Sequence, residues 1–183
     1  GWSISAIEGD HLDRMDSVLR LLGQSQVGTT SESNSWTDAK VFLLSRTSPT
    51  NTVPVVACVT GKWTVLADES DQLFHAIFLG KAGKILSRHF GTRVFAGFVQ
   101  NTTETYGYRL FDGEELRSVW IKGKSIEAFG VEFPGEPPVR DSFDGESMVA
   151  LARVLGFDPE AGVEQAKRYV LLSVLPTGST QTW

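Results

Sequence analysis

The chain has 183 residues, 41% of them hydrophobic and 21% charged, and a formal net charge of −5. This length and composition predict a single globular domain, residues 1–183, with one sizeable core. The acidic balance argues against nucleic acid as a partner, because a nucleic-acid binder needs a basic face that displaces counterions from phosphates. The longest apolar runs, such as 53–59, are far shorter than the ~20 residues that span a bilayer, so no membrane partner is predicted.

Cysteine usage favours a reducing compartment. The only cysteine, Cys58, has no second cysteine with which to form an internal disulfide, and the first residues show no charged and apolar leader. We therefore expect a soluble cytoplasmic protein.

The N-terminal residues predict a strand, a helix and a loop. Residues 2–7 alternate larger and smaller side chains, which is typical of a strand with one buried face. Asp10 is a good N-cap for a helix with apolar residues at helical spacing, and Gly23 is well placed to end it. Residues 24–37 are rich in Ser and Thr with almost no apolar side chains, so we expect a mobile loop there.

The next segments predict a hairpin, a further strand and a second helix. Residues 40–45 and 53–60 are apolar runs separated by a polar connector, which predicts the hairpin, and a turn then leads into a strand at 63–66. Ser70 is the expected N-cap of a helix over 70–90. Glycines at 80 and 83 weaken the middle of this helix and indicate a kink or a break.

Three strands at 93–100, 106–111 and 116–121 then predict an antiparallel meander. Residues 123–145 contain three prolines that are incompatible with a regular ladder, so we expect a long surface segment. The C-terminal part predicts a helix from Glu146 to Gly156, a short helix after Pro159, a final strand at 169–175 and a tail at 176–183.

Strands that arrive in hairpins, without regular strand–helix alternation, indicate the α+β class. We expect a mainly antiparallel sheet with two to four helices packed on one face. The sequence shows no internal repeat, and the Ser-rich loop at 24–37 is the one candidate linker.

The sequence contains no motif that identifies a catalytic reaction or a cofactor. The fragment 60–64, TGKWT, fails as a phosphate loop because Val56 stands where the first glycine belongs and Trp63 where Ser or Thr belongs. The signatures G-x-S-x-G, H-E-x-x-H and C-x-x-C are absent, and none of the three histidines has a partner at metal-ligand spacing. The sequence predicts no catalytic residue, no metal site and no cofactor.

The distribution of charge is the most informative feature. Residues 104–146 contain 10 acidic and 5 basic residues, whereas the rest of the chain is balanced. Such a strip attracts a basic surface, and aromatic residues among the charges are typical of interfaces. A plainly solvated face is the alternative explanation. The candidate partner-binding residues are Asp112, Glu114, Glu115, Arg117, Trp120, Glu132 and Glu136.

Four segments form a familiar pattern: WTVLADES at 63–70, YGYRLFDGEELR at 106–117, GEP at 135–137 and LGFD at 155–158. Together they resemble uncharacterised bacterial α+β proteins, some of which are similar to immunity proteins of polymorphic toxin systems. The resemblance implies a bacterial cytoplasmic protein that binds and neutralises a protein partner without catalysis. The acidic strip is compatible with a basic toxin as that partner.

Two other functions remain open. The first is a small-molecule-binding protein or enzyme, with a pocket between the 70–90 helix and the sheet where Trp63, Asp68, His75 and Arg93 would converge. The second is a structural homo-oligomeric subunit, which would present an extensive apolar symmetric interface.

Overall fold

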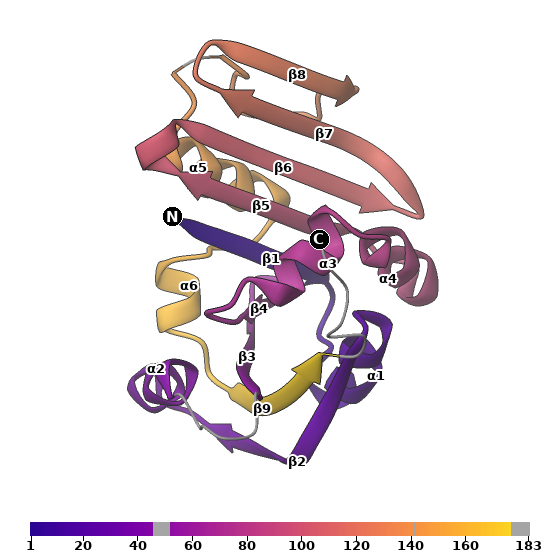
Figure 1. Ribbon diagram of the computed structural model, residues 1–183, viewed down its shortest axis with the longest axis vertical. Helices are drawn as coiled ribbons and strands as arrows, with labels where there is room; N and C mark the ends of the chain where they lie inside the picture. The colour runs from indigo at the N-terminus through magenta and orange to yellow at the C-terminus, as the bar shows by residue number, and fades with distance from the viewer. Residues whose placement is uncertain (46–51, 141, 177–183) are drawn as a thin grey trace.

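One antiparallel sheet of nine strands organises the residues that the structure, a computed structural model, describes: 1–45, 52–140 and 142–176. Its strand order is β2-β9-β3-β4-β1-β5-β6-β7-β8 (Figure 1). The strands are β1 (Trp2–Glu8), β2 (Gln24–Ser33), β3 (Val53–Thr60), β4 (Trp63–Ala67), β5 (Val94–Gln100), β6 (Thr105–Asp112), β7 (Glu114–Lys122), β8 (Ser125–Gly130) and β9 (Tyr169–Pro176). Every neighbouring pair is antiparallel, so the predicted α+β class is confirmed.

The helices lie on both faces of this sheet. They are η1 (Leu12–Arg14), α1 (Met15–Leu21), α2 (Trp36–Leu44), α3 (Gln72–Phe78), α4 (Ala82–Phe90), η2 (Asn101–Thr103), α5 (Gly145–Leu155) and α6 (Ala161–Glu164). Ile4 and Ala6 of β1 pack in the core beneath α5 and α2, whereas Ile7 packs in the core beneath α1, α3 and α4. In Figure 1, α3 and α4 lie in front of the sheet and α5 lies behind it.

The expectation that the helices share one face was therefore wrong. In β1, β3 and β5 four consecutive residues are buried. Such continuous apolar runs are typical of strands that are covered on both faces, whereas alternation marks a half-exposed strand.

Several predicted elements are confirmed. The expected first helix is present, as η1 followed by α1, but its first cap residue is His11 and not Asp10. The Asp10 carboxylate does accept a hydrogen bond from the Leu12 amide, at 3.1 Å. The 70–90 helix is broken into α3 and α4. Gly83 is required by packing, because a Cβ there would lie 2.4 Å from the ring of Phe111. The expected Ser70 cap is wrong: Asp68 accepts the hydrogen bond from the Gln72 amide instead, at 2.8 Å.

Residues 24–37 were misread as a mobile loop. They form β2, an edge strand that pairs along β9, and the first turn of α2. The predicted strand at 40–45 belongs to this same helix. Ser35 caps α2, and the buried residues Ala39 and Leu43 are four apart, which is a helical spacing.

The predicted surface segment 123–145 also contains a strand, β8, which forms a hairpin with β7. Residues 131–140 contain no helix or strand, and Phe133 and Val139 pack against the core on the α5 face of the sheet; we call these residues the strap. The predicted C-terminal tail, apart from Pro176 at the end of β9, lies outside the described residues.

Candidate functional site

The outer end of the sheet, built by β6, β7 and β8, presents exposed aromatic side chains. The register places Phe98 of β5 beside Gly107 of β6 and Gly107 beside Trp120 of β7. Because Gly107 has no side chain, the rings of Phe98 and Trp120 meet across it with centroids 5.1 Å apart. A Cβ on Gly107 would approach the Phe98 ring to 2.5 Å. This glycine therefore sets the position of both rings.

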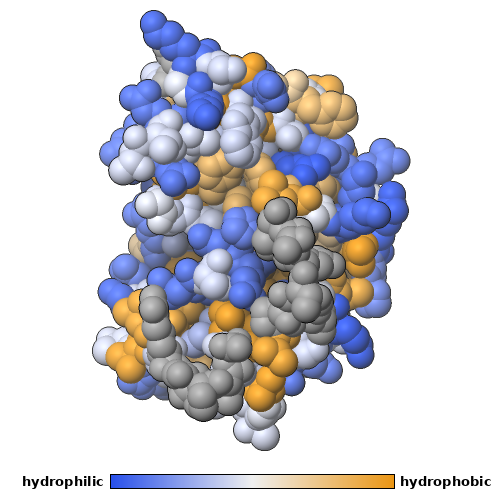
Figure 2. Space-filling model, in the orientation of Figure 1, coloured by the Kyte–Doolittle hydropathy of each residue, from blue (hydrophilic) through white to orange (hydrophobic). Residues whose placement is uncertain are grey.

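Phe129 of β8 extends this surface. It pairs with Ser118 of β7 and lies on the same face of the sheet as Trp120, since residues two apart on a strand share a face. Trp120 is 39% exposed and Phe129 is 59% exposed. We call Phe98, Trp120 and Phe129 the aromatic patch. Figure 2 shows hydrophobic side chains exposed among hydrophilic ones on this upper part of the molecule.

The β6–β7 hairpin carries three of the predicted contact acids, of which two are exposed and one is held in an ion pair. Asp112 and Glu114 are exposed at the turn. Glu115 is half-buried and pairs with Arg109 at 2.8 Å. Partial burial raises the pKa of Glu115, but the hydrogen bonds and the charge of Arg109 outweigh it, so the net pKa lies below the ordinary value. The Glu115 carboxylate therefore already has an ion-pair partner within the chain.

Arg117 and Glu136 form a buried ion pair, with side chains 5% and 1% exposed. The Arg117 guanidinium donates to both carboxylate oxygens of Glu136, at 2.9 and 3.1 Å. The hydroxyl of Tyr108 donates to the same carboxylate at 2.9 Å. Arg117 also donates to the backbone carbonyls of Phe129 and Gly130. These contacts fix the strap and the end of β8 to the sheet, so neither charged side chain faces a partner.

The seven sequence-predicted contact residues thus fall into two groups. Asp112, Glu114, Trp120 and Glu132 are exposed, whereas Glu115, Arg117 and Glu136 are held in internal ion pairs. Sequence reasoning missed the contribution of Phe98, because its meeting with Trp120 depends on the register across Gly107.

The four residues of the alternative pocket do not converge. Trp63 is buried on the α5 face, where the Arg93 guanidinium lies 5.1 Å from its ring centroid. His75 belongs to α3, which covers the opposite face. Asp68 follows the far end of β4 from Trp63. Apolar side chains fill the space between the α3–α4 pair and the sheet, among them Leu73, Ile77 and Leu86.

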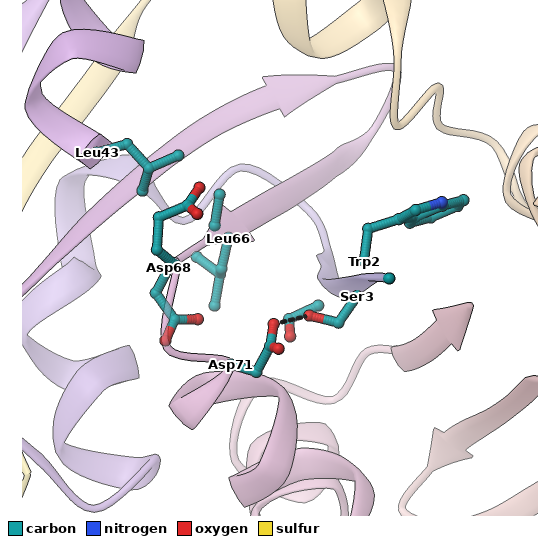
Figure 3. Close-up of a pocket in the computed structure, with 10 residues that line it drawn as sticks. Trp2, Ser3, Leu43, Leu66, Asp68 and Asp71 are labelled. Atoms are coloured by element: carbon teal, nitrogen blue, oxygen red, sulfur yellow. Dashed lines mark hydrogen bonds between the residues drawn. The ribbon is translucent and has the colours of Figure 1, made fainter. Parts of the chain in front are cut away.

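A small pocket of about 190 Å³ does lie beside Asp68. Figure 3 shows Leu43 and Leu66 on one side of it, and on the other Ser3, whose hydroxyl donates to Asp71 at 2.6 Å. Burial raises the pKa of Asp68. The described residues contain no group of three or more His, Cys, Asp or Glu side chains that could hold a metal ion. Among the described residues that line this pocket, nothing besides the acidic side chains points to a ligand, so we assign no ligand to it.

Cys58 is buried in β3, and this burial raises the pKa of its thiol to about 12, which disfavours the reactive thiolate at neutral pH. None of the helices in the described ranges is both long and apolar enough to cross a membrane.

Comparison with known proteins adds no further constraint. No family model, curated protein or solved structure matches the chain. The resemblance to immunity proteins therefore stays a prediction.

Proposed function

We propose that this chain is a non-catalytic protein-binding module whose contact surface is the outer end of its sheet. The observation that carries the proposal is the aromatic patch. Trp120 and Phe129 expose large rings on a face of β7 and β8, and exposed aromatic clusters beside polar residues are typical of protein interfaces. Gly107 leaves room for the rings of Phe98 and Trp120 to contact each other, so two of the three rings already meet within the chain.

Charge supports a basic partner. Residues 104–146 have 10 acidic and 5 basic side chains, and the pairs Arg109–Glu115 and Arg117–Glu136 each remove one charge of either sign. The acidic excess therefore remains on the other side chains of this segment, including Asp112 and Glu132. A basic protein would be attracted to this end of the molecule, which agrees with the immunity-like, toxin-neutralising role in a bacterial cytoplasm that the sequence suggested.

Affinity capture with matched variants tests this function. The wild-type chain, Trp120→Ser, Phe129→Ser and the control Val131→Ser are immobilised and exposed to a lysate at low and at high salt. Val131 is 86% exposed and lies beyond β8, outside the aromatic patch, so its replacement changes exposed apolar surface without touching the patch. We expect a basic protein that wild type and Val131→Ser retain at low salt and release at high salt.

The two patch variants should lose that protein while their melting temperatures stay close to that of the wild type. Retention by all four chains to the same extent would show that the patch is not the contact surface. Loss from all three variants, Val131→Ser included, would also contradict the proposal, since it would reduce the effect to a general loss of apolar surface.

A further inference from the structure

We infer that the free edge of β8 receives an extended segment of the basic partner as an additional strand. This inference rests on the proposed function and specifies how the partner is held. Backbone hydrogen bonds along an open sheet edge supply affinity in this mode of recognition, and alternate side chains supply specificity.

The edge is regular and open. Within the described residues β8 pairs with β7 alone, and the register runs without a shift from Lys122↔Ser125 to Arg117↔Gly130. All six residues of β8 are exposed, and the strand contains neither a proline nor a bulge. Prolines and bulges are among the features that usually protect an edge strand from pairing with another chain.

The hairpin geometry identifies the backbone groups that face outward. Gly123 and Lys124 form a two-residue turn, with Gly123 at φ 58°, between the paired residues Lys122 and Ser125. In such a hairpin the pair that flanks the turn is hydrogen-bonded, and bonded pairs then alternate along the ladder. By this alternation Ser125, Glu127 and Phe129 direct their amides and carbonyls towards β7. Those of Ile126 and Ala128 face away from the sheet.

Side chains along β8 define the segment that fits. Phe129 and Glu127 lie on the face of the aromatic patch, and Ile126 and Ala128 lie on the other face. A segment with apolar side chains beside Phe129 and Ile126 and a Lys or Arg opposite Glu127 would complement both faces, because cross-strand pairs of opposite charge and of apolar groups are favourable. The partner segment therefore has a basic residue with one apolar residue directly beside it and a second apolar residue two positions away on the other side.

A proline substitution tests the role of the β8 edge without changing the aromatic patch. Ala128→Pro removes an amide that faces outward and places a ring on the edge, while the ladder to β7 keeps its hydrogen bonds. Ala128→Ser keeps the amide and is the matched control. The probe is a display library of random short peptides selected on the wild-type chain, and the recovered peptides are synthesised and titrated against each variant.

We expect the recovered peptides to carry a Lys or Arg with an apolar residue beside it and a second apolar residue two positions away on the other side. Ala128→Pro should weaken peptide binding about tenfold or more, whereas Ala128→Ser should bind the peptides as wild type does. Amide exchange should slow at Ile126 and Ala128 when wild type binds the peptide. The comparison of the two variants is valid when their melting temperatures are close to that of wild type. If Ala128→Pro is unstable, amide exchange at Ile126 and Ala128 of wild type decides whether the peptide adds to the edge.

Failure of this inference is distinguishable from failure of the proposed function. If Trp120→Ser weakens peptide binding and Ala128→Pro does not, the patch remains the contact surface and strand addition is overturned. Peptides insensitive to both variants would overturn both proposals. Concentration-dependent dimers of wild type that Ala128→Pro abolishes would identify a second copy of this chain as the occupant and overturn the basic partner.

Discussion

The two edges of the sheet, β2 and β8, are built on opposite principles. β2 is polar, its register against β9 shifts between Val27 and Ser31, and Gly28 within the shift has φ 73°. β8 is regular, carries apolar side chains on both faces and keeps one register along its whole length. A bulge and mostly polar side chains make β2 a poor template for a further strand, whereas β8 has no bulge and only two polar residues, Ser125 and Glu127. The chain thus protects one edge and leaves the other available.

The anchors of the two edges differ as well. Arg117 and Glu136 hold the end of β8 from within the core, with both side chains almost fully buried. On the β2 side, Arg168 bonds Asp13 and Glu32 at the surface, where Asp13 is 85% exposed and Glu32 is 50% exposed. Buried charges depend on each other far more than exposed ones do. The open edge, β8, is therefore held by the buried ion pair, whose removal should cost more than removal of the exposed one.

Removal of the buried anchor should have the largest effect. Glu136→Ala leaves the Arg117 guanidinium buried without its counter-charge, which costs about 3–5 kcal/mol of unfolding free energy, measured by urea denaturation. The exposed Glu132→Ala is the matched control on the same strap. In hydrogen exchange the strap and the end of β8 should open first, since Arg117 also holds the carbonyls of Phe129 and Gly130. A loss no larger than that of the control would show that the pair does not anchor the edge.

Matched glycine substitutions compare the two edges directly. Gly28 and Gly130 both have positive φ, but a Cβ at Gly28 meets nothing within 4 Å, whereas one at Gly130 would lie 2.0 Å from the Leu116 carbonyl oxygen. Gly28→Ala should cost about 1–2 kcal/mol, the price of the left-handed backbone alone. Gly130→Ala should cost more, because β7 and β8 must also shift apart. Equal losses in urea denaturation would mean that β8 is as adaptable as β2.

This contrast also explains where sequence reasoning failed. The meander β5–β7 and the helix after Asp10 were predictable, because apolar runs bounded by turn residues and apolar side chains at helical spacing are local signals. β2 was not predictable in this way, since a polar edge strand with both faces in solvent has no burial pattern. α2 was misread because its apolar run 41–44 also suits a strand, although Ser35 and Asp38 mark a helix start.

The candidate site was predictable only in part. Charge counting selected the end of the molecule that carries the aromatic patch, and Trp120 is exposed there. It assigned Arg117 and Glu136 to the surface, because their pairing requires the strap to fold back over β7. Phe98 was missed for a similar reason: its neighbour Trp120 is two strands away, and only the register across Gly107 brings the rings together.

The smallest effect is expected at the exposed anchor of β2. Arg168→Gln should leave the melting temperature near that of wild type and speed amide exchange in β2 alone, because exposed ion pairs contribute little to global stability. The hydrogen bond from Arg168 is the main cause that lowers the pKa of Glu32. A lowered pKa in the folded state means that this contribution is present above the ordinary pKa of glutamate and is lost as the pH falls through the lowered value. The difference in β2 exchange between wild type and Arg168→Gln should therefore disappear in acid. A melting temperature lowered as far as in Glu136→Ala would show that the two edges are anchored alike, and the contrast between a protected and an available edge would then rest on the bulge and the polar side chains of β2.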